Sequence, residues 1–84
     1  MPYNILLIED DPEISEMLKN YLTAENYHIT CAFDGLDACL RFDEAAFDLV
    51  LLDLMIPKRS GMEVMQYIRK SSFVPIIIIS AKDT

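Results

Sequence analysis

The chain has 84 residues, of which 52% are hydrophobic, and it carries a formal net charge of −7. This length allows a single domain, and the acidic balance argues against direct binding of nucleic acid. No stretch approaches the roughly 20 apolar residues that cross a bilayer, and the first residues, "MPYN", lack the basic region of a signal peptide. We therefore expect a cytoplasmic location and no membrane partner.

The first predicted element is a strand over residues 4–9 that is buried on both faces, because its apolar run is continuous. The run ends in three acids, Glu9, Asp10 and Asp11. Asp11 and Pro12 are typical of a helix start, with Asp11 as the cap. Asn26 is predicted to end this helix in a left-handed conformation. Residues at helical spacing predict one buried face, made of Ile14, Met17, Leu18, Tyr21 and Leu22.

The middle of the chain repeats this pattern. Residues 28–32 are predicted to form a second strand, and Asp34 caps a helix whose inward residues are Leu36, Cys39 and Leu40. Residues 49–52 are nearly all apolar and predict a third strand, which Asp53 ends. A loop follows, and Ser60 and Glu63 have the spacing of a capping box.

The last two predicted elements are a helix and a strand. The helix that Ser60 starts is expected to bury Met62, Met65 and Ile68. The isoleucine run of residues 76–79, with Ser80, predicts a fourth strand. Strands that alternate with helices in this way indicate a doubly wound α/β fold, with a parallel sheet and helices on both faces.

The acids that end two of the strands are the candidate site. Ligands of such sheets bind at the carboxyl ends of the strands, and Glu9, Asp10, Asp53 and Ser80 all lie at carboxyl ends. If the first and third strands are neighbours, Asp53 faces Glu9 and Asp10 across about 5 Å. The crowded carboxylates should raise at least one pKa, and they suit Mg²⁺, which prefers oxygen ligands.

The chemistry that this site suggests is phosphoryl transfer. A carboxylate such as Asp53 can form an aspartyl phosphate, and the Ser80 hydroxyl could donate a hydrogen bond to the phosphoryl group. Single acids have simpler explanations: Asp11 and Asp34 as caps, Asp48 as a turn residue. Glu9 or Asp10 taken alone could be either structural or functional. Asp53 is the acid that a structural role explains least well, because it precedes a loop.

Three segments, "LLIEDDPEI", "FDLVLLDLMIPKRSG" and "PIIIISAKD", resemble the receiver domain of bacterial two-component response regulators. The amino-acid sequence of these segments is most similar to that of regulators that carry a winged-helix DNA-binding domain. The resemblance implies a flavodoxin-like fold, with strand order 2-1-3-4 in the part present here. It also implies transcription regulation and phosphorylation by a partner histidine kinase.

The resemblance assigns roles to individual residues. Asp53 matches the phosphoacceptor, and Glu9 and Asp10 match the acid pair that holds Mg²⁺ with it. Met55 matches the position whose backbone carbonyl ligates the metal, and Pro57 and Gly61 match the loop that follows. Ser80 matches the switch hydroxyl, and Ala81 matches the small residue that leaves room for the phosphoryl group.

The chain also departs from the family pattern. The last helix, strand and helix of a receiver have no counterpart, and neither does the family lysine that ends the fifth strand. We therefore expect residues 1–84 to be a partial receiver without an effector domain, from a longer regulator. Its own phosphoryl-transfer activity would be reduced.

Two other functions remain open at this stage. A hydrolase similar to the haloacid dehalogenases also uses an Asp nucleophile and Mg²⁺, but it needs a second Asp where this chain has Met55. The other is a non-catalytic assembly or folding fragment. The fourth strand has apolar residues throughout and little to protect its edge, which favours a homo-oligomer that pairs or packs these edges.

Overall fold

The computed structural model describes residues 2–56, 58 and 60–79. Its seven elements alternate between strand and helix: β1 (Asn4–Ile8), α1 (Pro12–Ala24), β2 (His28–Ala32), α2 (Gly35–Glu44), β3 (Leu49–Leu52), α3 (Gly61–Arg69) and β4 (Ile76–Ile78). The four strands form one parallel sheet in the order β2-β1-β3-β4. This order and the alternation confirm the predicted fold. β1 and β4 end one and two residues earlier than predicted.

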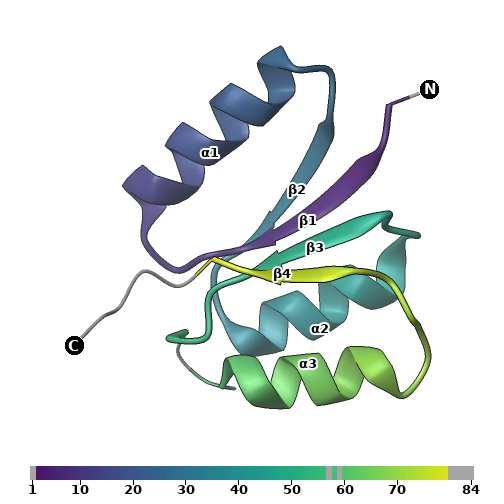
Figure 1. The fold of residues 1–84 in the computed structure, drawn as a ribbon. Coiled ribbons are helices and arrows are strands. Elements are labelled where there is room, and N and C mark those ends of the chain that lie inside the picture. The colour runs from purple at the N-terminus through teal and green to yellow at the C-terminus, as the bar shows by residue number, and fades with distance from the viewer. Residues whose placement is uncertain (1, 57, 59, 80–84) are drawn as a thin grey trace.

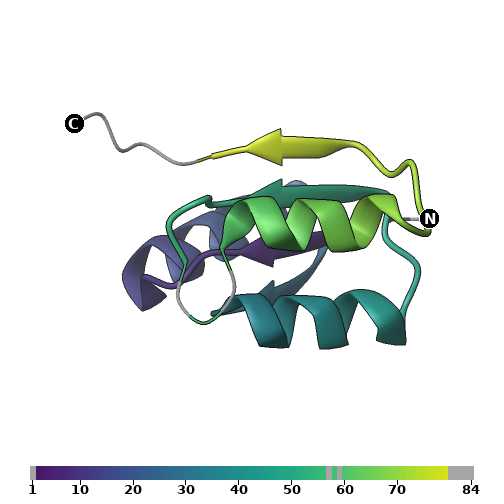
Figure 2. The same ribbon diagram turned by 90° about the horizontal axis from the view of Figure 1, so that it is seen from below.

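The helices lie on both faces of the sheet, as Figure 1 shows. α1 covers one face, and α2 and α3 lie side by side on the other. Figure 2 shows β4 as the outermost strand beyond β3. The main core fills the space between the sheet and the α2–α3 layer, and its fully buried residues include Leu6, Ile8, Val50, Leu52, Val64 and Ile68.

Side-chain caps fix where the helices begin. Asp11 accepts hydrogen bonds from the backbone N–H groups of Glu13 and Ile14, and Asp34 accepts one from Asp37. Ser60 and Glu63 form the predicted capping box. These caps satisfy donors that the first helical turn leaves without partners. The three assignments made from the sequence are confirmed.

Residues close to the ends of α1 and α3 also fix the turns that follow these helices. Asn26 ends α1 with a φ of 72°, which confirms the predicted left-handed stop. After α3, the Arg69 guanidinium donates hydrogen bonds to the carbonyl oxygens of Ser72 and Val74, at 3.2 and 2.7 Å. Arg69 thereby fixes the connection that carries the chain into β4.

The predicted inner faces of the helices were partly wrong. On α1, the side chains of Ile14, Met17 and Tyr21 are exposed, and on α2 so are those of Leu36 and Leu40. The reason for α1 is that it is the one described helix on its face of the sheet, so no other described helix covers its flank. α2 turns its small residues Ala38 and Cys39 inward instead.

In α3 the buried residues are Gly61, Val64 and Ile68. Ile68 was predicted correctly, Met65 is half-buried, and Met62 is exposed. Among the helices that the structure describes, none has the length and apolar character needed to cross a membrane.

Candidate functional site

The acids that follow β1 and β3 meet at one edge of the sheet. β1 and β3 are neighbours, with Ile8 opposite Leu52, and the Asp53 N–H donates to the Ile8 carbonyl oxygen at 2.9 Å. This pairing brings the two strand ends level. One carboxylate oxygen from each of Glu9, Asp10 and Asp53 lies within 4.8 Å of the others. The structure therefore brings together three of the predicted site residues.

The environment of these acids is unfavourable for negative charge. Glu9 and Asp53 are only 5% and 7% exposed, whereas Asp10 faces solvent. Burial raises the pKa of Glu9, and the negative charge of Asp53 raises it further. The direction agrees with the prediction that at least one pKa is raised, although burial contributes more than the crowding of the carboxylates. Within the described part of the chain, none of the ion pairs involves these three acids.

Backbone N–H groups orient the two buried carboxylates. Glu9 Oε2 accepts a hydrogen bond from the N–H of Asp11 at 3.1 Å, and Asp53 Oδ1 accepts one from the N–H of Met55 at 2.9 Å. A carboxylate has about four acceptor positions, so each group keeps capacity for a ligand. Converging carboxylate oxygens without a cationic side chain are a donor set that fits Mg²⁺.

A hollow of about 720 Å³ opens beside the acids. It extends along the side of the sheet that α1 covers, so that one end is acidic and the rest is apolar. Its lining residues are Glu9, Asp10, Asp11, Ile14, Leu18, Leu51, Asp53 and Ile79. The acidic end repels anions, so an anionic group could approach these carboxylates only with a cation to offset the charge.

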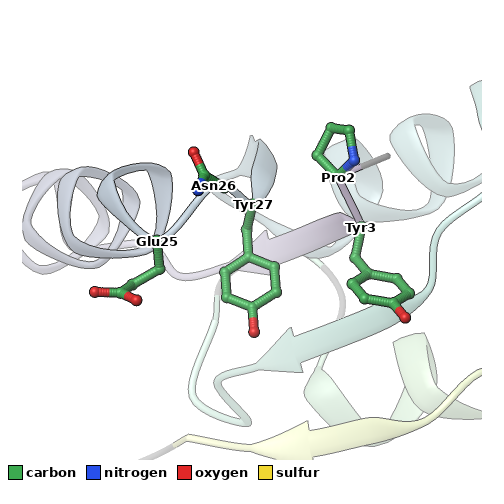
Figure 3. A pocket seen from close by; sticks show the side chains of 5 residues that line it. All are labelled: Pro2, Tyr3, Glu25, Asn26 and Tyr27. Carbon is green, nitrogen blue, oxygen red and sulfur yellow. The ribbon is translucent and has the colours of Figure 1, made fainter.

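A second hollow, of about 500 Å³, lies at the opposite end of β1. Figure 3 shows Tyr3, before β1, and Tyr27, before β2, pointing to the same side of the backbone, with Pro2, Glu25 and Asn26 around them. Glu25 is the one titratable carboxylate in this lining. The hollow has no converging set of acids, so the acidic edge is the candidate site.

The remaining predicted site residues lie in the loop after β3, at the start of α3 or outside the described residues. Met55 is in the loop between β3 and α3, with its side chain exposed and its backbone next to Asp53. Gly61 is buried at the start of α3. Pro57, Ser80 and Ala81 lie outside the described residues. Sequence reasoning missed Lys58, whose ammonium group lies 3.6 Å from Asp34. No local pattern indicates that contact, because it joins two separate loops.

The parallel sheet with helices on both faces defines a doubly wound α/β domain, and the three acids at its carboxyl edge form a candidate cation site. The sequence pattern of the response regulator receiver domain matches residues 5–84. The chain therefore belongs to the response regulator receiver family.

Curated relatives from Bacillus subtilis (strain 168) agree with this assignment. The chain is 49% identical over 78 residues to the uncharacterized transcriptional regulatory protein YcbL, with 93% of this chain and 34% of the relative covered. It is 44% identical over 84 residues to the similarly described YrkP, with 100% of this chain and 36% of the relative covered. The chain thus spans about a third of the length of these two relatives.

A solved structure supports the fold as well. The response regulator protein TrrA from Thermotoga maritima, in complex with Mg²⁺-BeF, superposes with a TM-score of 0.89 at 39% identity. The superposition covers 99% of this chain and 72% of TrrA. TrrA has also been solved in complex with the histidine kinase ThkA.

Proposed function

We propose that this chain is a phosphoacceptor: Asp53 receives a phosphoryl group from a partner histidine kinase in a Mg²⁺-dependent reaction. The observation that carries the proposal is the meeting of Glu9, Asp10 and the buried Asp53 within 4.8 Å at the carboxyl edge of the sheet. Membership in the receiver family supports it, and it favours this function over a hydrolase similar to the haloacid dehalogenases.

The residues of the acidic edge have two roles in this proposal, binding of Mg²⁺ and attack on phosphorus. Glu9, Asp10, Asp53 and the backbone carbonyl of Met55 would hold Mg²⁺. When bound, the ion would neutralise negative charge on the phosphoryl oxygens. The N–H of Met55 holds Asp53 Oδ1, so Oδ2 is the oxygen that attacks phosphorus. The new P–O bond forms as the bond from phosphorus to the kinase histidine breaks, and the histidine nitrogen keeps the electron pair.

Two further roles fall on residues outside the described part of the chain. We assign Ser80 the hydrogen bond to the phosphoryl group and Ala81 the space beside it. The protein is then a phosphoacceptor that assists its own phosphorylation and dephosphorylation, and not an enzyme acting on a separate substrate.

We infer the partners of this chain from its relatives and from its net charge. TrrA is solved with a histidine kinase, and we propose a sensor kinase as the partner here. YcbL and YrkP are described as transcriptional regulatory proteins, so we propose that the 84 residues are part of a receiver that controls a DNA-binding domain, in the cytoplasm. The net charge of −7 disfavours direct DNA contact by this segment.

We also propose that the chain self-associates through β4. β4 forms one edge of the described sheet, and Ile77 and Ile78, which point to opposite faces, are both exposed. An apolar strand edge of this kind favours pairing with a second copy. Light scattering at micromolar concentration should find a dimer that Ile77→Lys dissociates. A monomer over the whole concentration range contradicts this part of the proposal.

The phosphoacceptor assignment is tested by intact-protein mass. Acetyl phosphate and Mg²⁺ should add one phosphoryl group to the intact protein and none to Asp53→Asn. Asp48→Asn is the control, because this acid lies at the opposite end of the sheet, where it binds the N–H of Asn4. Equal labelling of Asp53→Asn and wild type refutes the assignment.

A further inference from the structure

The described residues of the loop between β3 and α3 (54–56, 58 and 60) make contacts with the protein interior. Its base is closed by a hydrogen bond from the N–H of Gly61 to the carbonyl oxygen of Leu54, at 3.2 Å. Ile56 is 8% exposed and belongs to the main core. The loop also carries Met55, whose N–H binds Asp53. A shift of this loop at Met55 would therefore disturb both the hydrogen bond that orients the Asp53 carboxylate and the proposed carbonyl ligand.

Lys58 connects the same loop to a neighbouring loop through a contact at the protein surface. Its φ is 72°, in the left-handed region that side chains other than glycine rarely adopt. A residue persists there only where its surroundings determine the backbone. The side chain of Lys58 forms an ion pair from this position, between its Nζ and Asp34 Oδ2, at 3.6 Å.

Asp34 is a well-fixed partner for Lys58. Its Oδ1 already accepts the N–H of Asp37 at 2.8 Å as the cap of α2, and its side chain is only 21% exposed. The pKa of Asp34 is lowered, mainly by this hydrogen bond and also by the charge of Lys58. Because the cap has already ordered the carboxylate, the ion pair needs to order only the lysine.

The position of this ion pair distinguishes it from the others. Arg41 pairs with Asp37 and Glu44 inside α2, so the Lys58–Asp34 contact is, among the described residues, the one ion pair between separate elements. It links the loops that follow β2 and β3, and β1 lies between these two strands. Glu9 and Asp10 follow β1, so the pair spans the edge that carries the acids.

We propose that Lys58 and Asp34 are positioning residues for the Mg²⁺ site. Their ion pair fixes the loop that carries Met55 to the start of α2, in the loop after β2, next to the β1 end that carries Glu9 and Asp10. Mg²⁺ therefore binds more tightly than it would to an untethered loop. This inference rests on the proposed function. The size of exposed ion-pair energies sets the expected gain at about two- to fivefold in Mg²⁺ affinity.

The decisive variant is Lys58→Met, since it separates positioning from simple charge. Removing a positive charge near the site should by Coulomb's law strengthen the binding of a cation. The positioning role predicts the reverse, a Mg²⁺ affinity about two- to fivefold weaker. Lys58→Arg should restore the affinity. Arg41→Met is the matched control, because it removes the same charge from pairs within α2, and it should not weaken binding.

The variant Asp34→Asn tests the other partner of the ion pair. Asn is also a good helix cap, so α2 stays capped while the ion pair is lost. The double variant Asp34→Asn with Lys58→Met should bind Mg²⁺ no more weakly than Asp34→Asn alone, because the two residues act as one unit. Calorimetric titration with MgCl₂ measures the affinities. Amide hydrogen exchange of Met55 and Gly61 reports loop opening without metal, and it should become faster in both single variants.

The outcomes separate this inference from the function on which it rests. If wild type binds no Mg²⁺, the magnesium site is refuted and the positioning role with it. If wild type binds Mg²⁺ but Lys58→Met binds it equally or more tightly, only the positioning role is refuted. Equal weakening by Arg41→Met also refutes the positioning role, because a change in overall charge would then suffice.

Discussion

Gly61→Ala should unfold the protein more easily and disturb the acidic site. A Cβ at this position would lie 2.5 Å from Leu54 Cα, 2.8 Å from Leu54 Cδ2 and 3.1 Å from the Asp53 carbonyl oxygen. The nearest of these atoms belongs to the backbone, so no side-chain rotation relieves the contact. Gly61 is therefore required by a close approach between α3 and the end of β3.

Two opposing effects set the size of the change. Alanine favours a helix over glycine by about 1 kcal/mol, whereas overpacking of a closed site costs about 1–3 kcal/mol. Because the contact is with backbone, we expect an overpacking cost in the upper part of this range, about 2–3 kcal/mol, and therefore a net loss of about 1–2 kcal/mol. For a domain of this size, each kcal/mol lowers Tm by about 4–8 °C.

Urea and thermal unfolding followed by circular dichroism measure this loss. Gln66→Ala is the control, because Gln66 is exposed on the same helix, and its effect should stay within about 0.5 kcal/mol. Gly61→Ala should also weaken Mg²⁺ binding, since the Asp53 backbone must move. A Gly61→Ala protein as stable as wild type, or more stable, refutes the close-approach argument.

Three further predictions concern buried polar groups. Ser15 Oγ is buried without a hydrogen-bond partner among the described residues, so Ser15→Ala should raise the free energy of unfolding by about 1 kcal/mol in urea titrations; a loss of stability contradicts this. Asp53→Asn relieves repulsion from Glu9, so the metal-free variant should melt above metal-free wild type and gain less from Mg²⁺; a variant that melts lower in both conditions makes Asp53 chiefly structural. The folded-state pKa of Glu9 lies above its ordinary value of 4.5, so the stability that Glu9 contributes is complete below that value. It is lost as pH rises through the raised pKa. Glu9→Gln should flatten this part of the metal-free pH–stability curve, and an unchanged curve refutes the assignment.

Much of the fold could be predicted from the sequence because its signals are local. The continuous apolar runs of β1 and β3 require burial on both faces, and a parallel sheet provides it. The caps at Asp11, Asp34 and Ser60 act within three residues, so their spacing alone identifies them. The meeting of Glu9, Asp10 and Asp53 followed from topology, since strands of a parallel sheet end at the same edge.

The errors arose where the neighbour of a residue decides its environment. Helical periodicity showed that α1 is amphipathic, but not that Met17 and Tyr21 would be 61% and 66% exposed on a flank that no second helix of the described residues covers. The Lys58–Asp34 contact depends on a left-handed backbone at a residue other than glycine. Neither the backbone conformation nor the pairing of two loops leaves a periodic signal in the sequence.

Chemical trapping of the aspartyl phosphate shows whether Asp53 accepts a phosphoryl group. The intact protein is treated with acetyl phosphate and Mg²⁺ and then reduced with borohydride, which converts an aspartyl phosphate to homoserine. Peptide mass spectrometry should find homoserine at position 53 and unmodified acids at positions 9 and 10, and omission of Mg²⁺ should abolish the product. Homoserine at position 10, or at no acid of this edge, contradicts the account.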